Sequence, residues 1–371
     1  MQPLTGVRVL DFSTLLPGPM ATLLLAEAGA EVIKIERPQT GEDLRSYEPR
    51  FADVSVLFAM LNRGKRSIAI DLKASDALAQ LRPLLEQADV LLEQFRPGVM
   101  DRLGLGYAAL SQINPRLIYC AITGYGQSGP KAQVAAHDLN YQADAGLLSI
   151  AAGSDGKPVV PNALVADIAG GAYPAVMNIL LALRQRDATG QGCMIDVSMT
   201  DGLFPFAYWG IGIGVATGHW PRPGGEQLSG GSPRYQIYAT ADGNYLAAAP
   251  LEDRFWAQFC EAIALPAALR DDRKDPEASR RAVAEIIGTR TAAQWRQQFE
   301  GKDVCCNVVR TLADAMNDAQ FKERGVFKRS VVSEDDALPA ISVPIDEAFR
   351  AGASELRYPH LGEANGMLGK P

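Results

Sequence analysis

Near its start the chain reads Val7-Arg8-Val9-Leu10, then a helical pattern over 19–28, then Glu31-Val32-Ile33-Lys34-Ile35, and this stretch decides its fold. Short runs of apolar, partly β-branched residues predict strands, and the longer pattern between them predicts a helix. A strand, a helix and a second strand of these lengths predict a right-handed crossover, which places the two strands parallel in one sheet.

The same alternation continues along the first part of the chain. Strand patterns cover 67–72, 89–95 and 117–122, and a helical pattern covers 75–87. Strands separated by helices in this way predict an α/β domain with a largely parallel sheet. The apolar stretch Ala169–Arg184 then predicts a long buried helix, opened by two glycines that let another backbone or a ligand approach closely.

The middle of the chain has a different pattern. Residues 218–233 are rich in glycine and proline, which indicates a loop or a domain boundary. After them, Ala241-Asp242-Gly243-Asn244 separates strand patterns over 234–239 and 245–249, which is typical of a hairpin. Helical patterns follow to about residue 316. We therefore expect a large domain that begins with 1–200, a linker and glycine-rich loop over 201–230, and a smaller α+β domain over 231–316.

Composition and charge narrow the class of protein. The 371 residues are 47% apolar and 21% charged with a net charge of −7, which is typical of a soluble globular protein and gives no support to nucleic-acid binding. The N-terminus has no secretory pattern, and the apolar stretches are shorter than the roughly 18–20 residues that span a bilayer. Five cysteines without CxxC spacing indicate free thiols. We expect a cytoplasmic protein with neither a membrane nor a nucleic-acid partner.

Basic residues near the predicted strands are candidates for an anionic ligand. The first strand–helix loop, Leu16-Pro17-Gly18-Pro19, lacks a dinucleotide fingerprint, and its prolines remove backbone donors, which argues against a nicotinamide enzyme. Arg37 and Arg96 each follow a strand, and carboxyl ends of parallel strands meet at one crevice, so we expect both in a shared phosphate pocket. Lys65 and Arg66 stand beside the third strand. The alternative is that all four are solvated charges.

A histidine and an aspartate suggest proton chemistry. His137 is one of only three histidines, and Asp167 follows thirty residues later. An imidazole and a carboxylate that face one carbon from opposite sides can remove a proton and return it. Taken singly, His137 also fits a structural histidine, and Asp167 a carboxylate that caps a helix. Glu252 likewise fits a cap for the helix that follows it.

Short sequence words along the chain, taken together, are more specific than any one residue. In order, they strongly resemble the class III CoA-transferase family, also called CaiB/BaiF, over nearly the whole chain. The resemblance implies a Rossmann-like large domain completed by 317–371, a smaller central domain and a homodimer of interlocked subunits. The words that carry it are Gly6–Leu10, Leu16–Pro19, Gly29–Pro38, Asn62–Lys65, Asp71–Lys73, Phe95–Val99, Thr123–Pro130, Thr189–Gly192 and Leu361–Glu363.

Within that family, the word Ala136-His137-Asp138-Leu139-Asn140-Tyr141 looks like the α-methylacyl-CoA racemase branch. The resemblance implies that His137 and Asp167 are the two bases and that Glu252 orients the histidine. It implies no metal and no cofactor beyond coenzyme A as part of the substrate. The coenzyme A contacts that it implies are Arg37, Gly64, Lys65, Arg66, Ser67, Ala88, Asp89, Val90, Arg96, Ala136, His137, Asp138, Leu139, Asn140 and Tyr141.

These residues lead to a functional hypothesis with two rivals. We expect an acyl-CoA racemase or epimerase that interconverts 2-methylacyl-CoA stereoisomers by 1,1-proton transfer through an enolate. The first rival is a CoA-transferase in which Asp167 is the nucleophile, and the second is a coenzyme A-binding protein without catalysis. Arg234 stands where the family commonly has an aromatic residue, which favours a polar or carboxylate-bearing acyl chain if it lies near the acyl pocket.

Overall fold

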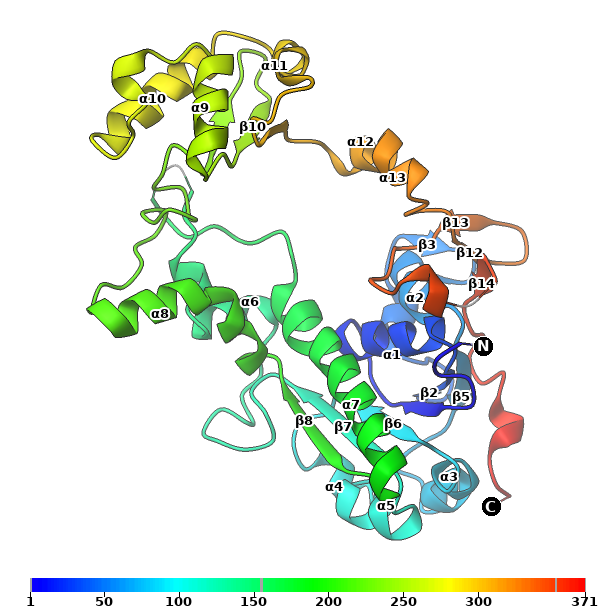
Figure 1. Ribbon diagram of the computed structural model, residues 1–371. Helices are drawn as coiled ribbons and strands as arrows, with labels where there is room; N and C mark the ends of the chain where they lie inside the picture. Colours follow the sequence, from blue (N-terminus) through cyan, green and yellow to red (C-terminus); the bar gives the residue numbers. More distant parts are fainter. Residues whose placement is uncertain (1, 154–155, 351, 371) are drawn as a thin grey trace. The chain divides into compact units, whose positions relative to one another are not determined.

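The computed structural model describes residues 2–153, 156–350 and 352–370, and the chain divides into two compact units (Figure 1). The first unit comprises residues 1–145, 162–205 and 319–371, and the second comprises 146–161 and 206–318. This division differs from the expected one in two places. Residues 146–161 belong to the second unit, where the Gly224 N–H donates to the Ile150 carbonyl at 2.9 Å. The expected linker carries helix α8 (Tyr208–Thr217) and is part of that unit from residue 206 onward.

The first unit is built on a six-stranded sheet, and the expected parallel α/β fold is confirmed. The strands run in the order β5-β2-β1-β6-β7-β8, and every neighbouring pair is parallel. In chain order this is the 3-2-1-4-5-6 arrangement of the Rossmann fold, with its switch point between β1 and β6. The bounds are Arg8–Asp11 (β1), Glu31–Glu36 (β2), Arg66–Ala69 (β5), Val90–Glu93 (β6), Ile118–Thr123 (β7) and Met194–Ser198 (β8).

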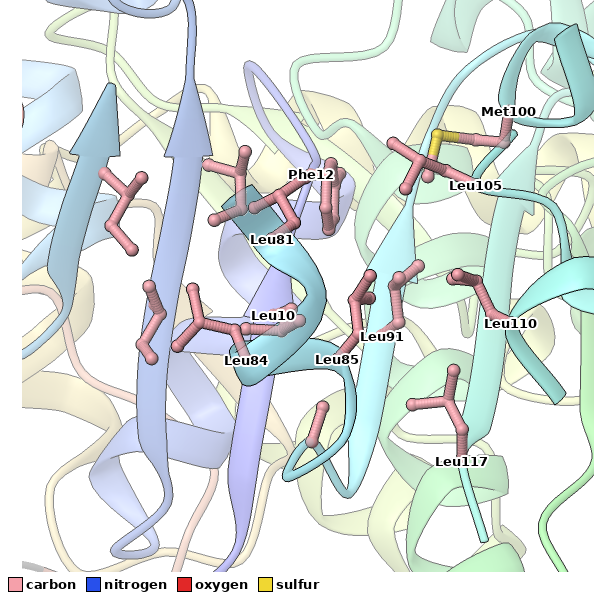
Figure 2. Packing of buried hydrophobic residues seen from close by; sticks show 14 of the residues in the cluster. Leu10, Phe12, Leu81, Leu84, Leu85, Leu91, Met100, Leu105, Leu110 and Leu117 are labelled. Atoms are coloured by element: carbon pink, nitrogen blue, oxygen red, sulfur yellow. The ribbon is translucent and has the colours of Figure 1, made fainter. Parts of the chain in front are cut away.

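Buried apolar side chains attach the helices to this sheet. Helix α3 (Ala77–Leu85) sets Leu81, Leu84 and Leu85 against strand residues that include Leu10 and Leu91 (Figure 2). All five of these side chains are at most 2% exposed, so this interface is a dry core. The other helices of the unit are α1 (Pro17–Glu27), α2 (Val56–Asn62), α4 (Val99–Arg102), α5 (Tyr107–Ile113), α6 (Asp138–Asp144), α7 (Tyr173–Thr189) and α13 (Ala319–Glu323).

Helix α7 is less buried than the long buried helix expected over Ala169–Arg184. It packs against α1, β7 and β8, yet its Tyr173, Met177, Leu180 and Leu181 are 40–62% exposed. The continuous helical segment Ala166–Thr189 is long and apolar enough, by length and composition alone, to cross a membrane. The expectation that no stretch reaches that length is therefore wrong, although a core helix of a globular domain passes the same test.

The C-terminal residues return to the first unit. They form a three-stranded sheet in which β12 (Ser330–Val332) pairs antiparallel with β13 (Ala337–Pro339) and parallel with β14 (Glu355–Arg357). The Arg357 carbonyl accepts the Gly64 N–H at 2.8 Å, which ties this small sheet to the residues before β5. A two-stranded ribbon, β3 (Arg50–Phe51) and β4 (Val54–Ser55), completes the strands described in this unit.

The second unit contains the predicted hairpin. Strands β9 (Gln236–Ala239) and β10 (Tyr245–Ala248) are antiparallel, and β11 (Cys306–Val308) adds to the free edge of β10. A core that includes Trp256, Phe259, Val283 and Trp295 lies between this sheet and the helices, which confirms the α+β character. The helices are α9 (Asp253–Ala262), α10 (Pro276–Ile287), α11 (Ala292–Phe299) and α12 (Leu312–Met316), besides α8.

Candidate active site

A cavity of about 360 Å³ lies at the carboxyl ends of the strands in the first unit. Its wall includes Leu15 and Pro17 after β1, the turn of residues 94–97 after β6, and Thr123 at the end of β7. In open parallel sheets, ligands bind in the crevice at the switch point, which here lies between β1 and β6. We call this space the first cavity. It also contains both residues predicted to transfer protons.

His137 lies at the rim of the first cavity, just before helix α6. Its backbone N–H donates to the Asn140 side-chain oxygen at 3.0 Å, which fixes the start of the helix. His137 is exposed and lines the first cavity. It is also the N-cap residue of α6, where it forms a capping box with Asn140. The residue therefore has a local structural role and remains accessible to a ligand.

Asp167 lies on the wall of the same cavity, in a π-helical turn (Ala166–Ala172) that leads into α7. Burial and the neighbouring Asp138 carboxylate raise the pKa of Asp167 to about 6, and His137 opposes this shift in part. The side chain of Asp167 does not cap the helix. Asp167 therefore lines the cavity with a carboxyl group whose raised pKa makes it a stronger base than an ordinary carboxylate.

The two glycines after Asp167 let the turn pack closely on the loop after β8. A Cβ atom on Gly170 would lie 2.4 Å from the Met199 carbonyl oxygen, and one on Gly171 would lie 3.0 Å from the Met199 side chain. The predicted close approach of another backbone is confirmed, because only glycine leaves room for this contact. This packing fixes the turn that carries Asp167.

A second cavity, of about 770 Å³, is lined by residues that follow β1, β2, β5 and β6. Three cationic side chains contribute to it, namely Arg37, Lys73 and Arg102. Arg37 donates to the Gly41 carbonyl at 3.1 Å and pairs with Asp43 at the surface. Lys73 and Arg102 are exposed, and neither forms an ion pair in the part of the chain that the structure describes. Phe95 lines both cavities, so the two adjoin.

Sequence reasoning missed Lys73 and Arg102, although signals for both are present. Lys73 belongs to a family word that directly follows a predicted strand, and Arg102 lies six residues after Arg96. Arg96 itself lines the first cavity and Arg37 the second, so the predicted pair does not share a single pocket. Both nevertheless lie at the carboxyl end of the sheet, where they were expected.

Lys65 is a correction, because its side chain cannot reach either cavity. It is fully buried, and its Nζ donates to Asp11 at 3.1 Å, to Thr22 at 2.7 Å and to Asn62 at 2.9 Å. Burial lowers the pKa of Lys65 to about 8, although the carboxylate of Asp11 opposes this shift. The charge therefore belongs to an internal network, in which a buried ion pair is satisfied by further hydrogen bonds.

The other residues predicted beside Lys65 and β6 are also used inside the fold. The Arg66 guanidinium bonds at 3.0 Å to Glu31, the first residue of β2, so it lies toward the amino ends of the strands. Ser67 is buried and donates to Glu36 at 2.7 Å, and Gly64 donates to the C-terminal sheet. None of Gly64, Lys65, Arg66 and Ser67 lines either of these two cavities.

The segment Ala88–Val90 lies where β6 begins, at the opposite end from the cavities. Ala88 and Val90 are buried. Asp89 accepts the Arg8 N–H at 2.8 Å and pairs with Arg186 at 2.8 Å. These partners satisfy the charge of Asp89 within the fold, and residues 88–90 line neither cavity.

Some residues of the racemase-like motif around His137 line the first cavity, and others point into the interior or to the surface. Ala136, Asn140 and Tyr141 line the first cavity, and the Tyr141 hydroxyl donates to the Ala136 carbonyl at 2.8 Å. Leu139 is 42% exposed and does not line the cavity. Asp138 points inward, so its predicted contact with coenzyme A does not hold for its carboxylate, which accepts hydrogen bonds from the Asp167 turn.

Two further predicted residues belong to the second unit. Glu252 is exposed at the start of α9, and its side chain does not cap that helix, so its role toward His137 stays a prediction. Arg234 is a correction. Its guanidinium makes a bidentate pair with Asp272 at 2.8 and 3.0 Å and also bonds to Asp253 and to the Leu251 carbonyl. Four of its five donors are used, so it holds the unit together and gives no support to a polar acyl chain.

The fold and these cavities define an α/β enzyme of the Rossmann-like class, with an imidazole and a carboxyl group in one cavity at the switch point. The chain belongs to CoA-transferase family III, whose model matches residues 4–365. It is 36% identical over 370 residues to the α-methylacyl-CoA racemase of Mus musculus, which covers 97% of this chain and 91% of that protein. It is 34% identical over 337 residues to the acetyl-CoA:oxalate CoA-transferase of Acetobacter aceti, with coverage of 88% and 86%. A crystal structure of a CAIB/BAIF family protein from Brucella suis superposes with a TM-score of 0.83 at 29% identity, over 98% of both chains.

Proposed function

We propose that this protein is an acyl-CoA racemase or epimerase that interconverts 2-methylacyl-CoA stereoisomers by 1,1-proton transfer. One observation carries the proposal. His137 and Asp167 line the same cavity, and the pKa of Asp167 is raised to about 6. An imidazole and a carboxyl group in one cavity can exchange the roles of base and acid, and the raised pKa makes Asp167 a stronger base than an ordinary carboxylate.

The chemistry needs a base for the carbon next to a thioester. A thioester carbonyl spreads the negative charge that forms when this carbon loses its proton, so the intermediate is an enolate. A carboxylate with an ordinary pKa of about 3.9 is a weak base. Burial and the neighbouring Asp138 raise the pKa of Asp167 and so make it a stronger base. One group removes the proton from one face, and the other returns a proton to the opposite face. The net result is inversion, with each group left in the other protonation state.

The two cavities suggest how coenzyme A would be held. The nucleotide end would occupy the second cavity, where Arg37, Lys73 and Arg102 offer charge-assisted contacts to phosphates. The thioester would then reach past Phe95 into the first cavity, beside Arg96. Binding of this remote handle would place the reacting carbon, which is how remote contacts assist a reaction. This arrangement replaces the phosphate grip by Lys65 and Arg66 that the sequence suggested.

The homodimer of interlocked subunits and the role of Glu252 are part of the same proposal. The exposed apolar side chains of α7, described above, form a face that a second subunit would cover, because monomers rarely expose large contiguous apolar patches. Glu252 would fix the tautomer of the His137 imidazole. Analytical ultracentrifugation tests the dimer, and the Leu181→Glu substitution on this face is expected to weaken it.

The experiment for the reaction is solvent exchange. A single stereoisomer of a 2-methylacyl-CoA is incubated with the enzyme in deuterated water, with no acceptor acid present. The racemase predicts that deuterium enters at the α carbon while optical purity is lost. A stable, unlabelled substrate would contradict it.

The alternative is CoA transfer between carboxylic acids, with Asp167 as the nucleophile. The accessible carboxyl group of Asp167 and the transferases among the relatives favour it. In that reaction the carboxylate attacks the thioester carbonyl, coenzyme A leaves, and an anhydride to Asp167 forms. Addition of a free carboxylic acid distinguishes the two, because only the transferase moves coenzyme A to it. If neither reaction occurs but coenzyme A binds, the protein is a binding protein without catalysis.

A further inference from the structure

We propose that Asp138 is a positioning residue for this proton transfer: its carboxylate holds the turn that carries Asp167 and places a negative charge beside it. The inference rests on the proposed function. It assigns a role to a side chain that does not contact the substrate. It also explains why the carboxylate adjacent to His137 points into the protein interior.

The contacts of Asp138 show how it holds the turn. Its Oδ1 accepts the backbone N–H of Ala166 at 2.7 Å and that of Asp167 at 3.0 Å. Its Oδ2 accepts from the Gln142 side chain at 2.6 Å, and the residue is only 5% exposed. A carboxylate that accepts the first N–H groups of a helix normally caps its own helix. Here it belongs to α6, 28 residues earlier in the chain.

The turn needs such a partner because its own backbone leaves donors unpaired. The first N–H groups of a helix have no carbonyl to bind within it. Residues 166–172 form a π-helical turn, a wide form that is rare and frequent at functional sites. Asp138 satisfies two donors at its start, and the tight contact of Gly170 with Met199 fixes its far part. Asp167 is therefore held from both sides.

The same contacts join the two proton-transfer groups. His137 and Asp138 are consecutive, and Asp138 bonds to the backbone of Asp167. A short path of one peptide unit and one hydrogen bond therefore links the residue bearing the imidazole to the residue bearing the carboxyl group. This path ties the turn that carries Asp167 to the start of helix α6.

The charge of Asp138 has a separate effect on protonation. The titratable groups that interact with Asp167 in the described part of the chain are Asp138, His137 and Tyr141. Burial and Asp138 raise the pKa of Asp167, and His137 lowers it. Asp167 therefore changes from the acid to the carboxylate as the pH rises through about 6. Loss of the Asp138 charge removes one cause of this upward shift, so the change then occurs at lower pH.

The Asp138→Asn substitution separates charge from shape. The amide oxygen still accepts the two N–H groups, and the amide nitrogen bonds to Gln142 once the Gln142 amide rotates. The exchange rate is measured against pH for the stereoisomer that Asp167 deprotonates. We expect the acidic limb of this pH–rate profile, where the rate rises as Asp167 ionises, to move about one pH unit lower. Asp138→Ala also removes the hydrogen bonds, and a misplaced turn is expected to lower kcat roughly 100-fold with little change in KM.

A matched control uses the other end of the same helix. Asp144 is exposed, pairs with Lys131 and accepts from Tyr125, and does not line the first cavity. Asp144→Asn makes the same change of charge, and we expect its acidic limb to match that of the wild type. If the acidic limbs of the pH–rate profiles of the wild type and of Asp138→Asn coincide, the inference about Asp138 is wrong, although the proposed racemase function still stands.

A readout without catalysis keeps the two proposals distinguishable. A water-soluble carbodiimide modifies protonated carboxyl groups, and mass spectrometry follows Asp167 between pH 4 and 8. We expect the midpoint of modification to fall in Asp138→Asn relative to the wild type and to Asp144→Asn. If the wild type exchanges no α proton but this midpoint moves, the proposed function fails and the effect of Asp138 on Asp167 stands. An unchanged midpoint would refute that effect.

Discussion

The two ends of the six parallel strands carry similar residue types in different states. Toward the amino end, Arg8 and Arg66 both bond to Glu31, and Asp89 pairs with Arg186. At the carboxyl end, Arg96, Lys73 and Arg102 line cavities, and none of them forms an ion pair within the described ranges 2–153, 156–350 and 352–370. The first end uses these charges to close the fold. The second also contains ion pairs, such as Arg37 with Asp43, but it leaves Arg96, Lys73 and Arg102 open to a ligand.

This difference follows from the topology more than from the residues. Loops after parallel strands diverge at the switch point, so a crevice opens between the loops after β1 and β6. Where the strands begin, Arg8 of β1 reaches Glu31 of β2 and Asp89 just before β6. Cations in the crevice such as Lys73 and Arg102 have no ion-pair partner within the described residues and are available to a ligand, whereas Arg8 and Arg66 at the other end share the carboxylate of Glu31.

The largest expected effect compares one carboxylate from each end. Asp167→Asn removes the base in the first cavity, and we expect loss of α-proton exchange by about 10²–10⁴-fold. Asp89→Asn changes a carboxylate near the amino end in the same way, and its exchange is expected to stay near the wild-type rate. Both are measured by deuterium incorporation. Equal losses in the two variants would remove the distinction between the ends.

The next effect compares one cation from each end. Arg102→Ala removes a charge from the second cavity, and we expect KM for the acyl-CoA to rise about 10–100-fold, since a hydrogen bond to a charged group contributes about 1.5–3 kcal/mol. Arg66→Ala removes a charge that pairs with Glu31, so KM is expected to stay unchanged. A rise in KM for Arg66→Ala but not for Arg102→Ala would move the nucleotide site to the amino end.

The smallest effect concerns stability and its pH dependence. The folded-state pKa of Asp167, about 6, is above its ordinary value of 3.8, so its ionisation lowers the stability of the fold progressively as the pH rises from about 3.8 to about 6, and the loss is complete above that range. We expect Asp167→Asn to raise Tm by roughly 2 °C at pH 8 and to leave it nearly unchanged at about pH 3, where the wild-type carboxyl group is mostly protonated in both the folded and the unfolded state. Calorimetry at the two pH values tests this, and an equal gain at both would exclude the ionisation as its cause.

The sequence predicted the parts of the fold that depend on local pattern. Apolar runs identified five of the six parallel strands, and a turn signal identified the β9–β10 hairpin. The strand Met194–Ser198 was missed because it lies at the sheet edge and is mostly not buried, so its sequence lacks an apolar run. Residues 146–161 were misplaced because contacts with residues far along the chain, such as Gly224, assign them to the second unit.

Roles of charged residues were less predictable, because a role depends on partners distant in sequence. The sequence pattern placed Lys65 near a strand. It did not show that Asp11, 54 residues earlier, would pair with Lys65 in the interior. The role of Arg234 was mispredicted for the same reason, because its partner Asp272 is 38 residues away in the sequence. By contrast, the sequence motif Ala136–Tyr141 pointed to His137, and the position of Asp167 before a predicted helix pointed to that residue. The structure places both residues on one cavity.

A crystal structure with a stable thioether analogue of a 2-methylacyl-CoA tests the central claim most directly. The account predicts that the phosphates contact Arg37, Lys73 or Arg102, and that the α carbon lies between the His137 ring and the Asp167 carboxylate, about 3–3.5 Å from each reacting atom. An analogue whose phosphates lie beside Arg66 and Asp89, or whose α carbon lies outside the first cavity, would contradict it.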